Sequence, residues 1–108
     1  MNVAQSLKSL SAYPIPLATL QNIAEGVGLA IDTELTQELR GSKDFRKAQA
    51  LVYLYLSEAP NVSQGGISYS FSEDERRRLR TRGEAILDEI GDDSADNGIT
   101  YGYMGEDL

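Results

Sequence analysis

The sequence predicts a mainly α-helical protein: a small helical bundle around one central apolar helix, with two short β-strands at about residues 66–71 and 98–103. Apolar residues recur at helical spacing, and the stretch 51–56 is apolar nearly all round, as in a helix buried on several sides. The two strand stretches alternate apolar with other residues. A chain of 108 residues can build one core and not two, so we predict a helical domain at 1–91 and an acidic tail at 92–108.

The N-terminal third is predicted to form two short helices joined by a stiff connector. Asn2 can cap a first helix that ends near Tyr13. The connector is Tyr13-Pro14-Ile15-Pro16, in which Pro16 suits the first position of the next helix. That second helix is expected to run to about Val27, because two neighbouring glycines weaken its end.

A third helix is predicted over 33–40, with Asp32 as its N-cap. A glycine and then Ser42, a fresh cap, follow it. The pattern therefore leaves open whether 33–59 is one bent helix or two. The central helix must end at Pro60, because proline lacks the amide that would continue the helix and disfavours helix in the residue before it.

Both predicted strands carry aromatic residues. After a bend at Gly65-Gly66, the first strand alternates Ile67, Tyr69 and Phe71 with serines. The second lies in the tail and presents Ile99, Tyr101 and Tyr103 on one face. An isolated two-stranded ribbon is marginal in water, so we expect these strands to lean on the helices or on another chain. Tyr69 and Phe71 can cover the helical core, whereas an exposed edge is also a template for a neighbouring chain, the role we favour for the tail tyrosines.

The last helix is predicted to begin at a capping box, Ser72-Glu73-Asp74-Glu75, and to end at Gly91. Two of its turns hold a cluster of five arginines: Arg76, Arg77, Arg78, Arg80 and Arg82. They can form a solvated face paired with nearby carboxylates. The alternative, which the pattern favours slightly less, is a docking patch for an acidic partner or a phosphate backbone. The sequence leaves both interpretations open.

The composition argues against an enzyme. The chain has no histidine and no cysteine, so the commonest general base and the commonest metal ligands are missing. No nucleophile elbow or P-loop spacing occurs, and the carboxylates lie where solvated faces and caps are expected. In the tail, Asp92, Ser94 and Asp96 resemble the start of a calcium loop, but Tyr103 replaces the glutamate that such loops need. We expect no catalysis, no cofactor and no bound metal.

Charge and hydropathy further restrict the function. The formal net charge of −7 opposes strong sequence-independent binding to nucleic acid. The N-terminus lacks the basic start and apolar run of a signal peptide, and no stretch approaches the roughly 20 apolar residues of a membrane span. We therefore expect a soluble cytoplasmic protein without a membrane partner.

From about Tyr13 to Ile90 the chain carries, in order, the motifs YPIP, LTQEL, YLYLSEAPNVSQGG and ISYSFSEDERRRLRTRGEAIL. This order resembles that of the small head–tail connector (head-completion or adaptor) proteins of tailed bacteriophages and prophages. Its most specific part is the stretch from Ala59 to Gly66 with the serine-alternating strand after it.

The resemblance implies a structural virion protein that forms a homo-oligomeric, twelvefold ring between the portal protein and the tail or a further connector. It places the protein in the host cytoplasm before assembly and in the virion neck afterwards, with DNA passing nearby without specific binding. The subunit contacts would correspond to 66–71 and 98–103. The alternative is a small winged-helix DNA-binding regulator, suggested by the helix–strand order and the arginine cluster. A third class, an antitoxin or inhibitor, would use the tail from Gly91 onward.

Overall fold

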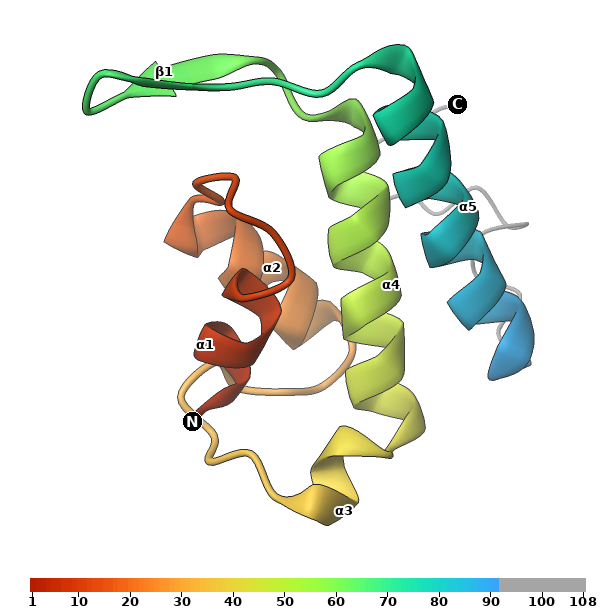
Figure 1. Ribbon diagram of the computed structural model, residues 1–108. Helices are drawn as coiled ribbons and strands as arrows, with labels where there is room; N and C mark the ends of the chain where they lie inside the picture. Colours follow the sequence, from red (N-terminus) through yellow and green to blue (C-terminus); the bar gives the residue numbers. More distant parts are fainter. Residues whose placement is uncertain (92–108) are drawn as a thin grey trace.

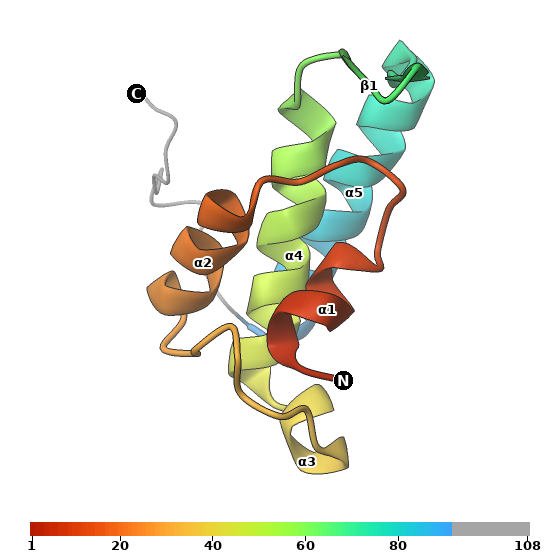
Figure 2. The same ribbon diagram turned by 90° about the vertical axis from the view of Figure 1, so that its left-hand side faces the viewer.

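The central element of the protein is helix α4 (Lys43–Glu58), which the computed structural model places between two groups of helices (Figure 1). The structure describes residues 1–91. Helix α5 (Glu73–Glu89) runs antiparallel along one side of α4, and α1 (Val3–Lys8) and α2 (Leu17–Gly26) lie on the other side (Figures 1 and 2). The short helix α3 (Gln37–Arg40) lies at the N-terminal end of α4. The predicted mainly helical fold with two short strands is confirmed.

Burial of α4 explains its apolar excess. Its fully covered positions are Phe45, Ala48, Ala50, Val52, Leu56 and Ser57. Ser57 is tolerated inside because its hydroxyl donates to the carbonyl of Leu54 at 2.6 Å. Ser42 caps the helix by accepting from the amide of Phe45 at 3.2 Å, and the chain turns extended at Ala59, ahead of Pro60. Residues 33–59 therefore hold two helices, which answers the question that the sequence left open.

Helices α4 and α5 approach closely at Gly83. A Cβ atom built on Gly83 would lie 2.9 Å from the carbonyl oxygen of Ala50 and 2.9 Å from Cγ of Leu54. Only a residue without a side chain lets the two backbones come this near. Further along the pair, Leu87 is buried, and Arg46 Nη2 lies 2.6 Å from Oε1 of Glu89. Because this ion pair is partly exposed, it contributes at most about 1 kcal/mol.

The N-terminus is hydrogen-bonded to the loop before α3, and this changes the predicted start of the third helix. The amide of Val3 donates to the carbonyl of Thr33 at 3.0 Å, and Asn2 pairs with Glu34 in an isolated β-bridge. Residues 33–35 are therefore not helical, and the prediction that Asp32 caps a helix over 33–40 is wrong. Thr36 is the cap, accepting from the amide of Leu39 at 3.1 Å.

Two other boundaries in the N-terminal third differ by a few residues. Helix α1 has the predicted Asn2 cap within a full capping box, but it ends at Lys8 and not near Tyr13. Residues 11–16 form a segment without helix or strand that carries Tyr13 and Ile15 into the core. Pro16 is the N-cap of α2 and not its first helical residue, since its ψ of 143° is still extended.

The strands form an antiparallel hairpin. Strand β1 (Val62–Gln64) pairs with β2 (Ile67–Tyr69) in the register Val62–Tyr69, Ser63–Ser68 and Gln64–Ile67. Gly65 and Gly66 form the two-residue loop with φ of 61° and 80°. Two positive φ angles define a type I′ turn, which matches the twist of the strands and requires residues such as glycine.

The hairpin corrects the strand prediction in two ways. The strand predicted at 66–71 is shorter, at 67–69, and its partner is β1, which the sequence reading did not identify. The second predicted strand, at 98–103, lies outside the described residues. The helix that follows agrees with its prediction: Ser72 and Glu75 form the capping box of α5, and Gly91 follows its C-cap with φ of 71°.

One hydrophobic core joins these elements around α4. Its largest fully buried side chains are Phe45, Leu7, Leu20, Leu56, Val3 and Val52. None of the helices within residues 1–91 is both long enough and apolar enough to cross a membrane.

Candidate interaction surface

The hairpin projects sideways from the end of α4 and reaches beyond the helices (Figure 1). From Ser63 to Ser68 every residue is exposed, and Ile67 leaves 56% of its surface in solvent. Ser63 and Ser68 face each other across the strands with their hydroxyl oxygens 3.3 Å apart. Within residues 1–91 the sheet has two strands, so the outer edge of each strand has no partner strand.

The base of the hairpin, in contrast, is attached to the core. Val62, Tyr69 and Phe71 are half-buried and pack against the core cluster. The ring of Phe71 stacks on that of Tyr13, with centroids 5.6 Å apart and planes at 23°. Among the predicted strand residues, Tyr69 and Phe71 therefore help to cover the core, and Ile67 is the one that stays exposed.

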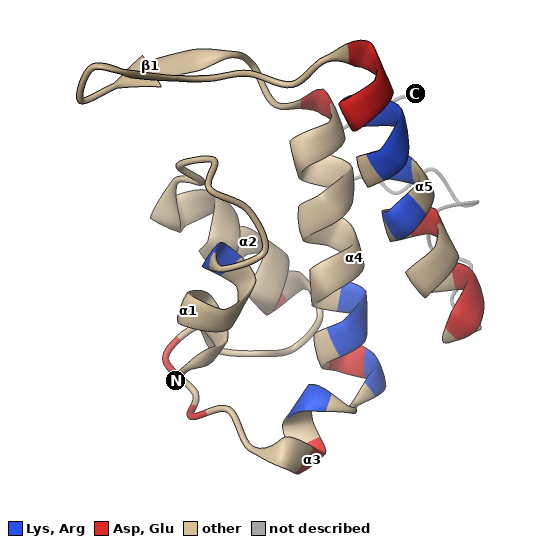
Figure 3. Ribbon diagram, viewed as in Figure 1, with Lys and Arg blue, Asp and Glu red and all other residues tan. Residues whose placement is uncertain are grey.

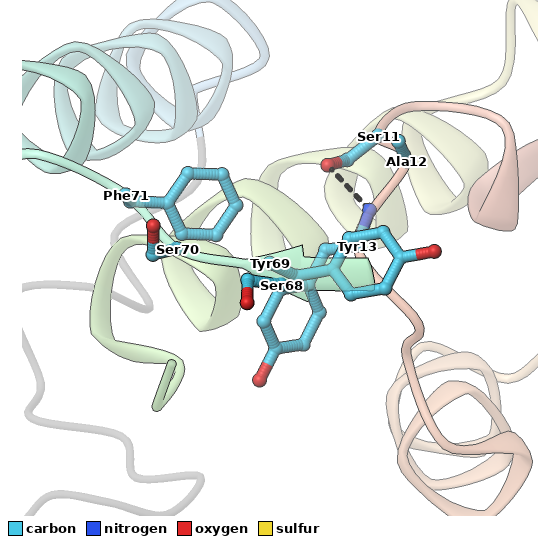
Figure 4. Close-up of a pocket in the computed structure, with 7 residues that line it drawn as sticks. All are labelled: Ser11, Ala12, Tyr13, Ser68, Tyr69, Ser70 and Phe71. Atoms are coloured by element: carbon cyan, nitrogen blue, oxygen red, sulfur yellow. Dashed lines mark hydrogen bonds between the residues drawn. The ribbon is translucent and has the colours of Figure 1, made fainter. Parts of the chain in front are cut away.

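A shallow cavity of about 170 Å³ opens between the hairpin and the segment before Tyr13 (Figure 4). Its walls are three aromatic rings and small residues: Ser11, Ala12, Tyr13, Ser68, Tyr69, Ser70 and Phe71. The amide of Tyr13 donates to the hydroxyl of Ser11 at 3.1 Å and orders that wall (Figure 4). The cavity is apolar enough to take an aliphatic side chain and offers hydroxyl groups at its rim.

Of the five clustered arginines, Arg76 makes several hydrogen bonds and also contacts an aromatic ring. Its Nη1 donates to the carbonyl of Ala59 at 2.7 Å and to that of Ser57 at 3.3 Å, and its Nη2 donates to Oδ1 of Asn61 at 3.0 Å. Its guanidinium also lies 5.6 Å from the ring centroid of Phe71. The carbonyls at the end of α4 have no partner within that helix, so Arg76 acts as the cap of α4.

The other four arginines differ in their surroundings, within the basic part of α5 that follows its acidic first turn (Figure 3). Arg77 is paired with Asp74 at 3.1 Å, and Arg82 lies 5.3 Å from the ring centroid of Tyr53. Arg78 and Arg80 are exposed. At 100° per residue, Arg76 lies within the stripe that holds the buried residues Gly83 and Leu87. Arg80 lies on one side of this stripe, and Arg78 and Arg82 lie on the other. The fold thus divides the cluster, and a docking patch over all five stays a prediction.

Two ionisable groups near the hairpin have shifted pKa values. Burial raises the pKa of Tyr13, the phenol of Tyr55 adds to this, and the charge of Arg76 opposes it. Hydrogen bonds from the backbone and the hydroxyl of Ser72 lower the pKa of Glu75, and Arg78 acts in the same direction. Tyr13 stacks on Phe71 at the base of the hairpin, and Glu75 lies in the first turn of α5.

The remaining site predictions concern the tail residues, metal binding, catalysis and cofactors. Ile99, Tyr101 and Tyr103 lie outside them. Over residues 1–91, no group of three or more histidine, cysteine or acidic side chains is arranged to hold a metal ion. The expectations of no catalysis and no cofactor stay predictions.

Sequence reasoning missed two contributors to this surface. Strand β1 was signalled by the Gly-Gly pair, which stands between two short runs at the loop length of a type I′ hairpin. Tyr13 had no comparable local signal. Its hydroxyl donates to the carbonyl of Pro60 at 2.6 Å, across 47 positions of sequence.

Comparison with models of protein families, with curated proteins and with solved structures gave no match.

Proposed function

We propose that this protein is a structural subunit of a tailed-phage or prophage particle, forming a ring between the portal protein and the tail. The observation that carries the proposal is the hairpin, whose end lies outside the helical core with Ile67 56% exposed. A hairpin of this kind is marginal alone in water. Its open edges can accept a strand from another chain, and its tip offers an apolar side chain to a neighbour.

A ring follows from such a contact if the hairpin meets a different surface of the next copy. Contacts between unlike surfaces close into rings when the rotation between neighbours divides a full turn. The resemblance to phage connectors suggests twelvefold symmetry, the portal as one partner and the tail or a further connector as the other. The protein would enter the virion neck from the host cytoplasm.

The charge of the chain fits a ring through which DNA passes without being gripped. The net charge is −7. Arg76, Arg77 and Arg82 have partners within the described chain. A surface that binds DNA without sequence preference needs several cations that are free to neutralise phosphates. DNA is therefore proposed as a neighbour and not as a ligand.

The test is assembly with purified portal, followed by size-exclusion chromatography with light scattering. We expect a monomer or weak oligomer alone and a stoichiometric ring on the portal. Ile67→Lys should weaken ring formation at least tenfold, whereas Leu17→Lys should not, although Leu17 is 61% exposed on α2. A wild-type protein that stays monomeric with every portal preparation would refute the proposal, as would equal effects of the two lysines.

The alternative of a winged-helix DNA-binding regulator is favoured by the order of a helix, a hairpin and an arginine-bearing helix, with Arg78 and Arg80 exposed. Against it, the helix before the hairpin is α4, which contacts α1, α2, α3 and α5. The recognition helix of a DNA-binding domain must leave one face free to enter the major groove. A gel-shift titration separates the two: affinity for duplex DNA that falls steeply with salt supports the regulator.

A further inference from the structure

The base of the hairpin is held by three side chains: Phe71 and Arg76, which follow the hairpin in the sequence, and Tyr13 from the N-terminal part of the chain. We propose that these three, named here the hairpin clamp, fix the direction in which the hairpin projects from α4. The clamp thereby determines how the hairpin meets a partner. Only this last step rests on the proposed function. The geometry of the clamp stands on contacts within one chain.

The clamp holds both arms of the hairpin. On the incoming arm, Arg76 donates to the carbonyl of Ala59 at 2.7 Å and to Oδ1 of Asn61 at 3.0 Å. Between these two residues, the carbonyl of Pro60 accepts from the hydroxyl of Tyr13 at 2.6 Å. Three consecutive residues at the exit of α4 are thus fixed by two side chains. The chain has no freedom to pivot there unless these bonds break.

On the outgoing arm, Phe71 lies between the same two side chains. Its ring stacks on Tyr13 at 5.6 Å, and the guanidinium of Arg76 lies 5.6 Å from its centroid. The planar guanidinium can stack on a ring and donate in its own plane at the same time, which an ammonium cannot do. Arg76 therefore joins both arms to each other and to the start of α5.

The two-stranded sheet itself contributes only Val62 and Tyr69 to the contact with the core within residues 1–91. Its strands have three residues each, and beyond Tyr69 and Val62 toward the tip every residue is exposed. A surface that is already oriented loses less conformational entropy when it binds. The clamp thus pre-organises the hairpin, and it gives Arg76 a positioning role, separate from the exposed Arg78 and Arg80.

The experiment compares three single variants of the full chain. Arg76→Gln removes the charge and most donors of the clamp, and Tyr13→Phe removes only the hydroxyl that reaches Pro60. Arg80→Gln is the matched control, because it makes the same change at an exposed position on the same helix. For each variant, NMR residual dipolar couplings report the orientation of the hairpin amides relative to those of α4. Hydrogen exchange reports their opening.

We expect Arg76→Gln to reduce the dipolar couplings of residues 62–69 by at least half and to speed their exchange at least tenfold, with the couplings of α4 unchanged. Tyr13→Phe should give a smaller change of the same kind, and it decides the question if Arg76→Gln does not fold. Arg80→Gln should match wild type. Unchanged hairpin couplings in the folded clamp variants would overturn the proposal.

Portal assembly gives the second readout. Arg76→Gln should lower the affinity for the portal ring at least tenfold relative to Arg80→Gln. A loosened hairpin with unchanged assembly would overturn the positioning role. If the wild-type chain fails to bind portal at all, the proposed function fails, and the dipolar couplings still decide whether the clamp orients the hairpin.

Discussion

Replacing Gly83 by alanine tests the packing of α4 against α5. An alanine in a helix interior is normally better than glycine by about 0.5–1 kcal/mol, because glycine loses more backbone entropy on folding. At this position, however, the new Cβ would lie 2.9 Å from the carbonyl oxygen of Ala50, where ordinary contact begins at 3.4 Å. The obstacle is a backbone atom in the middle of a helix and not the end of a flexible side chain.

The clash can be relieved only if the helices separate by about half an ångström, from 2.9 Å to 3.4 Å at the closest atom. Overpacking of this kind costs about 1–3 kcal/mol. After the gain in helix propensity is subtracted, we expect Gly83→Ala to lower the free energy of unfolding by up to about 2.5 kcal/mol net. For a domain of this size, that corresponds to a fall of up to roughly 20 °C in Tm.

The assay is urea unfolding followed by far-UV circular dichroism, with Gly26→Ala as the control. Gly26 is also a helical glycine, at the end of α2, and a Cβ there meets nothing within 4 Å. The control should be as stable as wild type or up to about 1 kcal/mol more stable. If Gly83→Ala matched or exceeded its control, the close approach of α4 and α5 would not be a constraint, and the reasoning would fail.

Three further predictions concern the core and the pH dependence of the hairpin junction. Leu56→Ala, at a fully buried site on α4, should cost about 2–5 kcal/mol in the same urea assay. The lowered pKa of Glu75 implies stability that is present above its ordinary pKa and is lost as pH falls through the folded value, so acid should fray the start of α5. Glu75→Gln, which keeps the capping hydrogen bond, should remove that part of the pH dependence in NMR shifts of residues 73–76. The raised pKa of Tyr13 implies stability that is present below pH 10 and is lost as pH rises toward the folded value, and Tyr13→Phe should flatten this alkaline loss in thermal melts.

The sequence predicts the helical parts of this fold well because their signals are local. Ser42 and the Ser72–Glu75 box cap the helices that they were expected to cap, and Pro60 ends α4. Asp32 failed as a cap because residues 33–35 instead bond to the N-terminus. That contact joins positions more than thirty residues apart, and no local propensity encodes it.

The same distinction applies to the candidate surface. A cluster of five arginines in the sequence indicates positive charge, but it does not indicate which groups each guanidinium contacts in the fold. Arg76 donates to the carbonyls of Ser57 and Ala59, which have no hydrogen-bond partner within the helix because α4 ends at Glu58. Arg80, four residues further on, stays exposed. Burying a guanidinium is tolerated only with several acceptors, and only the folded chain supplies them at one position and not at the other.

The exposure of Ile67 has a cause that alternation alone could not show. Ile67 and Tyr69 point to the same face of β2, since side chains alternate along a strand. Tyr69 covers the core, so a period-two pattern predicts that Ile67 covers it too. The hairpin, however, extends past the helices. Ile67 is two residues nearer to the tip than Tyr69, a distance of about 6–7 Å along the strand. Ile67 is thus exposed because the sheet extends beyond the helical core. Its side chain nevertheless lies on the same face of β2 as that of Tyr69. Within residues 1–91, Ile67 keeps 56% of its surface in solvent, and this makes the end of the hairpin the strongest candidate contact of the described chain.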